Sequence, residues 1–387
     1  MRFEFATAGR IIFGPGTLGE LRGALKELGA RQLLIVHGAS AERARPVLEI
    51  AAETGIESAQ FAVPREPTTA LVTEGVRLAR ERECDAVIGF GGGSVIDAAK
   101  AIASLAANPG DVLDYLEVIG RGQPITKPSL PWIAIPTTAG AGTEVTRNAV
   151  IISPEDKVKA SLRSPLLLSR LAIVDPELTR DLPPAITAAT GLDALTQLIE
   201  PYVSIRSNPM TDGLCLEGMH RVARSLRRAY LDGAASAEAR EDMAMAALFG
   251  GLALANAGLG AVHGFAAPIG GMFPSAPHGA VCAALLPHVM RVNLRALRNR
   301  NPQSGVLHRY NQVARILTGN YQAWADEGVE WITTLCAALQ IPQLGAYGIG
   351  AADIPLLVEN GSRASSMKPN PIPLTIDELT EILEAAI

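Results

Sequence analysis

The chain has 387 residues, of which 48% are hydrophobic and 19% charged, and its formal net charge is −5. This length favours two domains over a single core. The charges are interspersed, without a basic face or polybasic run, so we expect neither nucleic acid nor a membrane as a partner. Four isolated cysteines and an N-terminus without an apolar signal core predict a cytoplasmic protein.

The N-terminal half alternates apolar strand-like runs with amphipathic segments. This alternation predicts an α/β domain with a parallel sheet and right-handed crossovers. The expected strands are residues 10–13, 33–36, 58–63, 85–90, 130–135 and 171–174, and the expected helices are residues 18–28, 45–54 and 69–83.

The fourth expected strand runs directly into three glycines, Gly91, Gly92 and Gly93, followed by Ser94. Glycines at a strand-to-helix corner let the backbone approach a phosphate, and the helix that follows directs free N–H groups at the anion. The spacing is not the G-x-G-x-x-G of the common dinucleotide fingerprint. We therefore predict an anion site here, with a simple tight turn as the alternative.

A second small-residue loop, from Thr137 to Thr146, follows the next strand. Its hydroxyls and glycines suit a backbone that passes close to a ligand, or equally a turn that caps itself. Farther on, Pro183 and Pro184 mark the expected boundary between domains 1–183 and 184–387. After this point helical periodicity predicts an all-α bundle, with helices expected over residues 187–200, 211–230, 237–257, 325–339 and 376–386.

Four polar residues of the second half form a candidate metal site. Asp193 and Gln197 are four residues apart, so both lie on one face of the expected helix. His263 and His278 bound an apolar, glycine-rich passage. A carboxylate with two imidazoles suits Fe²⁺ or Zn²⁺, which could polarise an alcohol or carbonyl oxygen. The alternative is a core carboxylate with two structural histidines.

At these residues the chain resembles the iron-containing (group III) alcohol dehydrogenases. The resemblance spans nearly the whole length and rests on the motifs Phe90-Gly91-Gly92-Gly93-Ser94, Pro136-Thr137-Thr138-Ala139-Gly140, Gly191-Leu192-Asp193-Ala194-Leu195-Thr196, His263-Gly264 and Pro277-His278-Gly279. It implies a dinucleotide-binding α/β domain, a helical domain and a cleft between them. It also implies hydride transfer between NAD(P)H and a small alcohol/aldehyde pair, with Fe²⁺ or Zn²⁺, in a homodimer or larger homo-oligomer.

The resemblance also assigns roles to single residues. It implies that Asp193, His263 and His278 are catalytic residues and metal ligands, with Gln197 at the fourth ligand position. The residues that it places along the cofactor are Gly92, Gly93, Ser94, Asp97, Thr137, Thr138, Thr146 and Lys159.

The chain departs from the family pattern at three places. Gln197 stands where a histidine is usual, and an amide oxygen is a poorer ligand for Fe²⁺ or Zn²⁺. Ala267 replaces a histidine that often follows His263. Gly38 replaces an aspartate that is common in NAD-preferring relatives, and with Ser40 it leaves room for a 2′-phosphate, so we expect NADP(H) to be favoured over NAD(H).

Three other functions remain open from the sequence. Gln197 is compatible with a metal-independent reductase similar to maleylacetate reductases. The two-domain frame is also that of dehydroquinate-synthase-like lyases, which regenerate their cofactor in each turnover. A catalytically silent relative that only binds nucleotide is the third alternative.

Overall fold

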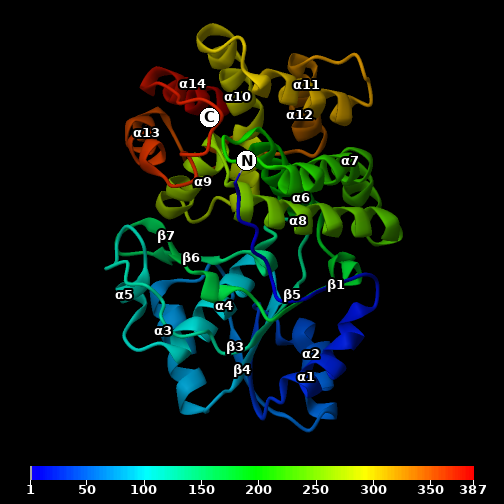
Figure 1. Ribbon diagram of the computed structural model, residues 1–387, viewed down its shortest axis with the longest axis vertical. Coiled ribbons are helices and arrows are strands. Elements are labelled where there is room, and N and C mark those ends of the chain that lie inside the picture. The colour runs from blue at the N-terminus through cyan, green and yellow to red at the C-terminus, as the bar shows by residue number, and fades with distance from the viewer. Residues whose placement is uncertain (1) are drawn as a thin grey trace. The chain divides into compact units, whose positions relative to one another are not determined.

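The computed structural model describes residues 2–387, which divide into two compact units. The sheet unit consists of Ala6–Thr138 and Gly142–Thr179. The helical unit consists of Arg180–Ile387, the short segment Ala139–Ala141 and the N-terminal residues that end at Phe5. Figure 1 shows the strands in the first unit and the long helices in the second.

The sheet unit is built on six parallel strands in the order β1-β8-β5-β4-β2-β3. Parallel strands need crossovers, which the intervening helices supply. The strands are β1 (Ile11–Phe13), β2 (Gln32–His37), β3 (Glu57–Ala62), β4 (Ala86–Gly91), β5 (Trp132–Pro136) and β8 (Leu171–Val174). The helices are α1 (Leu21–Leu28), α2 (Ala41–Glu53), α3 (Thr69–Glu81), α4 (Gly93–Ala107) and the single turn α5 (Val112–Tyr115).

Strand β2 shows how the sequence specifies a sheet that is covered by helices on both faces. Leu33 and Ile35 face a core that includes residues of α1 and α2, whereas Leu34 and Val36 face a core that includes residues of α3 and α4. Because side chains alternate along a strand, a continuous apolar run is buried on both faces. The predicted parallel α/β sheet is confirmed. An antiparallel hairpin that the sequence did not predict, β6 (Asn148–Ser153) and β7 (Val158–Arg163), follows β5.

The helical unit is all α, as predicted. Its long central helices are α6 (Pro184–Val203), α7 (Pro209–Asp232), α8 (Ala237–Ala257) and α10 (His278–Arg300). The remaining helices are α9 (Ala261–Met272), α11 (Gly305–Thr318), α12 (Ala325–Ala338), α13 (Ile354–Arg363) and α14 (Ile376–Ala386). The apolar passage after His263 is therefore a helix, α9, despite its glycines, because its residues are buried in the bundle core.

One helix of the described residues, α10, has the length and hydropathy of a candidate membrane span. In its most apolar window 83% of the residues are buried, which is typical of the core helix of a bundle. The helices α8 and α9 pass the same test only as a pair that is bent by 99°.

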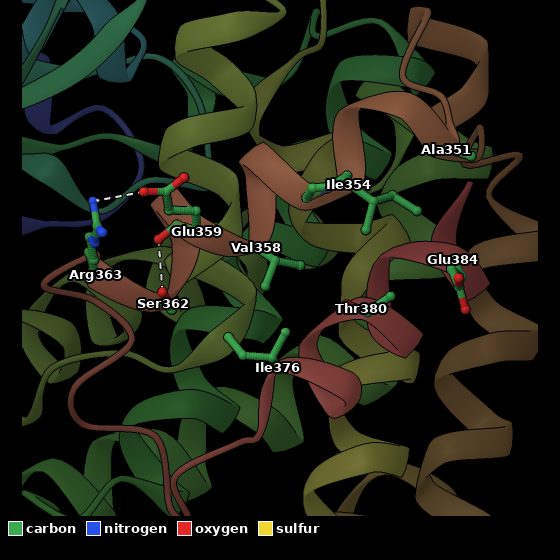
Figure 2. Close-up of a pocket in the computed structure, with 10 residues that line it drawn as sticks. Ala351, Ile354, Val358, Glu359, Ser362, Arg363, Ile376, Thr380 and Glu384 are labelled. Carbon is green, nitrogen blue, oxygen red and sulfur yellow. Dashed lines mark hydrogen bonds and ion pairs between the residues drawn. The ribbon is translucent and has the colours of Figure 1, made fainter.

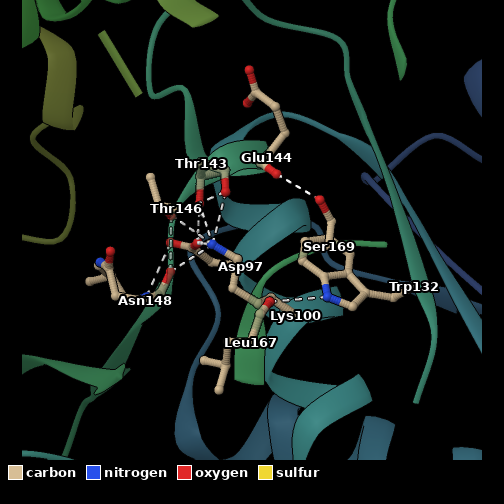
Figure 3. Close-up of polar contacts among 10 residues, drawn as sticks. Asp97, Lys100, Trp132, Thr143, Glu144, Thr146, Asn148, Leu167 and Ser169 are labelled. Atoms are coloured by element: carbon tan, nitrogen blue, oxygen red, sulfur yellow. Dashed lines mark hydrogen bonds and ion pairs between the residues drawn. The ribbon is translucent and has the colours of Figure 1, made fainter. Parts of the chain in front are cut away.

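A buried lysine joins α4 to the loop before β6 (Figure 3). The side chain of Lys100 is fully buried, and its Nζ donates hydrogen bonds to the carbonyl of Asn148 at 2.7 Å and to Thr146 Oγ1 at 2.8 Å. Asp97 accepts hydrogen bonds from Thr143 Oγ1 and from the amide of Val150. Burial lowers the pKa of Lys100 to about 8, although nearby Asp97 and Glu144 oppose the shift.

The buried Glu144 predicts a pH dependence of stability. Burial raises the pKa of its carboxyl to about 7 from the ordinary 4.5, with Lys100 opposing the shift. Between these pH values the folded chain binds more protons than the unfolded chain, so this group's contribution to the unfolding free energy falls as pH rises. We expect the unfolding free energy of the wild type, relative to Glu144→Gln, to fall by about 1–3 kcal/mol from pH 4.5 to pH 7. Urea unfolding of both proteins at both pH values measures this difference. Unfolding free energies of the wild type and of Glu144→Gln that change in parallel with pH would contradict the prediction.

Candidate metal centre and cofactor corner

Four donor side chains converge within the helical unit. Among the described residues, Asp193, His263, His278 and Cys282 each offer a ligand atom, and all four atoms lie within 4.8 Å of one another. Asp193 comes from the middle of α6, His263 from the first turn of α9, and the other two from the first turns of α10. Three of these residues were predicted from the sequence, and Cys282 was not.

The four atoms face a common point. Asp193 Oδ1 lies 3.4 Å from His263 Nε2 and 3.9 Å from His278 Nε2. The Cys282 sulfur lies 3.8 Å and 3.7 Å from the same two nitrogens. The two imidazole rings are tilted by 55° with centroids 5.4 Å apart, so they do not stack face to face. Donor atoms at such separations around one point are typical of a metal site.

Glu200 orients His263 from the opposite side. Its Oε2 lies 2.7 Å from His263 Nδ1, and its Oε1 accepts a hydrogen bond from the amide of Val262 at 2.7 Å. A carboxylate only accepts hydrogen bonds, so Nδ1 carries a proton, and in the neutral imidazole Nε2 keeps its lone pair for the site. A carboxylate that holds the distal nitrogen of a ligand histidine is a recurrent feature of metal centres.

The electrostatics of the cluster favour positive charge. Burial alone would raise the pKa of Asp193, but His278 and His263 lower it, so this carboxyl is an anion. Burial would lower the pKa of His263, but Cys282, Asp193 and Glu200 raise it well above the ordinary value. In the described part of the chain, Asp193 Oδ1 is a buried oxygen without a hydrogen-bond partner. A cation, either a proton or a metal ion, would satisfy this oxygen.

Gln197 lies one turn after Asp193 on α6 and is buried. Its side chain lies beside the Asp193 carboxylate and helps to lower the pKa of that group. Its Oε1 is another buried atom without a partner among the described residues. Gln197 therefore orients Asp193, and its role as a metal ligand stays a prediction.

The predicted phosphate corner lies within the sheet unit. Gly92, in an extended conformation, precedes α4, whose first residue is Gly93. A side chain at Gly91 would collide with Val95 at 2.6 Å, so the corner depends on small residues. The open N-terminus of α4 supplies free N–H groups, as an anion site requires. Ser94 follows in the same helical turn, and Thr137 and Thr138 follow β5, the strand next to β4.

The other predicted cofactor residues make contacts within the protein. Asp97 and Thr146 belong to the buried Lys100 network. The Nζ of Lys159 lies 3.1 Å from Glu66 Oε2, and only 6% of its side chain is exposed. Gly38 and Ser40 lie between β2 and α2, where Ser40 precedes the first helical residue.

A hollow of about 680 Å³ between α13 and α14 is separate from the cluster (Figure 2). Apolar side chains such as Ile354, Val358 and Ile376 line it, together with an ion pair between Glu359 and Arg363. None of the four clustered donors lines this hollow, so it is not the candidate metal site.

The two units define a class of protein. A parallel sheet with a glycine corner, together with a helical unit that holds a cluster of metal-type ligands, suits a metal-associated, nucleotide-dependent oxidoreductase. Comparison with known proteins gives the family. Residues 8–176 match the model of the iron-containing alcohol dehydrogenases, and residues 187–387 match the C-terminal domain of the same family.

Individual relatives agree with this family. The chain is 35% identical to alcohol dehydrogenase 4 of Schizosaccharomyces pombe, over 97% of this chain and 87% of that protein. It is 34% identical to 1,3-propanediol dehydrogenase of Klebsiella pneumoniae, over 99% and 98% of the two chains. A crystal structure of 1,3-propanediol oxidoreductase superposes with a TM-score of 0.92, at 33% identity and full coverage of both chains. The chain belongs to the iron-containing alcohol dehydrogenase family, and it is an oxidoreductase that acts by hydride transfer.

A prediction follows for Glu200. Replacing it with glutamine keeps its shape but removes the negative charge that holds His263 Nδ1. Loss of a carboxylate partner of a ligand histidine costs about 10- to 100-fold in metal affinity. We expect a loss of this size for Zn²⁺ bound to Glu200→Gln, measured by competition with a chelating dye. The matched control is Glu217→Gln on the exposed face of α7; equal affinities in both variants would contradict the prediction.

Proposed function

We propose that this oxidoreductase interconverts small alcohols and aldehydes, using a nicotinamide cofactor and a divalent metal held by Asp193, His263 and His278. The single observation that carries the metal assignment is the convergence of these side chains around the buried, unpartnered Oδ1 of Asp193. The donor set of one carboxylate and two imidazoles fits Fe²⁺ or Zn²⁺. This fit favours the metal-dependent dehydrogenase over the metal-independent reductase, because a metal-independent reaction does not require converging metal ligands.

In the proposed mechanism the protein supplies orientation and charge. Glu200 fixes the ring of His263, and Gln197 fixes the carboxylate of Asp193. When bound, a divalent metal supplies a Lewis acid that polarises the substrate oxygen. Position 267 is an alanine, so the substrate proton travels through water or the cofactor ribose and not through a side chain at that position.

Elemental analysis together with an activity screen tests this proposal. We expect about one Fe or Zn per chain in the purified protein, and oxidation of NADPH or NADH in the presence of aldehydes. Chelation that empties the site should abolish turnover, and re-addition of the metal should restore it. Full activity in demonstrably metal-free protein would overturn the Lewis-acid role and favour the metal-independent reductase. Tight nucleotide binding without turnover of any aldehyde or alcohol would favour a silent relative.

We further propose NADP(H) as the preferred cofactor. A Cβ atom added at Gly38 would meet no atom within 4 Å, so there is room beside the end of β2. Ser40 precedes α2, but its hydroxyl makes no capping hydrogen bond, which leaves it and the N-terminus of the helix to receive a phosphate.

We also propose that the protein acts in the cytoplasm as a homodimer or larger homo-oligomer. Size-exclusion chromatography with light scattering tests the oligomeric state.

The cofactor preference predicts the effect of Gly38→Asp. A carboxylate there would repel a 2′-phosphate and accept a hydrogen bond from a ribose 2′-hydroxyl. We expect the ratio of kcat/KM for NADPH to that for NADH to fall at least about tenfold, which corresponds to about 1.4 kcal/mol. Gly23→Asp, at another glycine with open space around it, should leave the ratio unchanged. A wild type that already prefers NADH on one aldehyde would contradict the proposal.

A further inference from the structure

We propose that Cys282 is a metal ligand, so that the ion is held by Asp193, His263, His278 and the Cys282 thiolate in a site that favours Zn²⁺ over Fe²⁺. This inference rests on the proposed function, because it concerns the same ion. It goes beyond it by assigning a role to a sulfur atom and a metal preference to the site.

Local structure places this sulfur at the site. Helix α10 begins at His278, and Cys282 follows four residues later, one turn along the same face. The side chain is fully buried, and its sulfur lies nearly equidistant from the two imidazole Nε2 atoms. The first two turns of α10 therefore present two donors to one point, and α6 and α9 present one each.

The separations of the donor atoms fit a tetrahedral ion. With Zn–N and Zn–O bonds of about 2.0–2.1 Å and a Zn–S bond of about 2.3 Å, a tetrahedron has N···O edges of about 3.3 Å and N···S edges of about 3.6 Å. The observed N···O separations are 3.4 Å and 3.9 Å, and the N···S separations are 3.8 Å and 3.7 Å. Three of these separations lie within about 0.2 Å of the ideal edges, and the separation between Asp193 Oδ1 and His278 Nε2 would have to shorten by about 0.6 Å.

Gln197, the other candidate for the fourth ligand, is less suitable. Its Oε1 has no hydrogen-bond partner in the described part of the chain and is available as a donor, so the comparison rests on donor chemistry. A neutral amide oxygen is a weaker donor than a thiolate for Zn²⁺, and thiolate ligands favour Zn²⁺ over harder ions. The thiol proton leaves for solvent when the ion binds. A substrate oxygen would then be a fifth ligand, which zinc in catalytic sites sometimes accepts.

Cobalt substitution tests the inference, because Co²⁺ bound to a thiolate absorbs in the near ultraviolet by charge transfer and Co²⁺ bound only to nitrogen and oxygen does not. Metal-free full-length protein is titrated with Co²⁺ in the wild type, in Cys282→Ser and in Cys215→Ser, which changes an equally buried thiol in α7. We expect the band in the wild type and in Cys215→Ser, and its loss in Cys282→Ser. Zn²⁺ affinity should fall at least tenfold in Cys282→Ser only. If this variant does not fold, Cys282→Ala takes its place.

The outcomes separate this inference from the proposed function. Stoichiometric Co²⁺ binding without the band in the wild type, or a band that persists without Cys282, would overturn the role of the sulfur and leave the metal site standing. A wild type that binds neither Co²⁺ nor Zn²⁺ would overturn both. Gln197→Leu should keep the band, and loss of Zn²⁺ binding in that variant with no loss in Cys282→Ser would assign the fourth ligand to Gln197 instead.

Discussion

Replacing His263 with alanine is expected to remove the metal and the activity together. The Nε2 atom of its ring lies within the donor cluster, 3.4 Å from Asp193 Oδ1, and alanine offers no ligand atom at this position. Loss of an outer partner of a ligand already costs about 10- to 100-fold in metal affinity, so loss of a ligand should exceed about 100-fold. Metal content per chain and kcat/KM, measured on the same preparation, should fall in parallel.

The His263→Ala experiment needs two controls. The substitution also leaves Glu200 Oε2 buried without its partner, which costs about 1–3 kcal/mol of stability, so thermal melting must show that the variant is folded. His220→Ala removes an exposed histidine from α7 and should change neither metal content nor activity. A folded His263→Ala protein with full metal content and wild-type kcat/KM would refute the assignment.

The second large effect is expected from Gly279→Ala, next to His278. A Cβ atom at this position would lie 2.4 Å from the carbonyl oxygen of Ala189 and 3.3 Å from the Cβ of Asp193. Helix α10 would have to move away from α6 by about 1 Å to restore ordinary contact. Such overpacking costs about 1–3 kcal/mol. A displacement of about 1 Å can also lower the rate about 100-fold.

The measurement for Gly279→Ala is the unfolding free energy together with metal content and kcat of the folded protein. Gly213→Ala is the matched control, because Gly213 lies in α7 and a Cβ there would meet no atom within 4 Å. That control should be neutral or more stable by up to about 1 kcal/mol, since alanine favours helix. Equal stability and activity of the two variants would show that α6 and α10 tolerate separation at the site.

The sequence predicted the elements whose pattern is purely local. The apolar run of β2 and the helix α8, predicted over residues 237–257, follow from periodicity alone. The hairpin β6–β7 and the helix α9 did not, because β7 mixes polar and apolar residues in a short run and α9 contains three glycines and a proline. In both cases tertiary burial outweighs local propensity.

The members of the donor cluster were predicted in part for the same physical reason, and their roles stay predictions. Asp193, His263 and His278 carry side chains whose chemistry is recognisable at any position. Cys282 and Glu200 were missed, although simple spacing could have indicated both, since Cys282 is four residues after His278 and Glu200 is seven after Asp193. The burial of Lys100 could not have been anticipated, because its hydrogen-bond partners lie more than 40 residues away in the chain.

Helix α6 carries Asp193, Gln197 and Glu200 on successive turns of one face; Asp193 belongs to the donor cluster, Gln197 lies beside it, and Glu200 contacts His263. The three side chains therefore point in a similar direction from the helix axis, and any rotation of the helix moves them together. Deleting a single residue near the start of α6 would rotate all three by about 100° relative to α9 and α10. One deletion would therefore displace all three side chains from the cluster together. We expect insertions and deletions in α6 to be tolerated after residue 200 and not before residue 193.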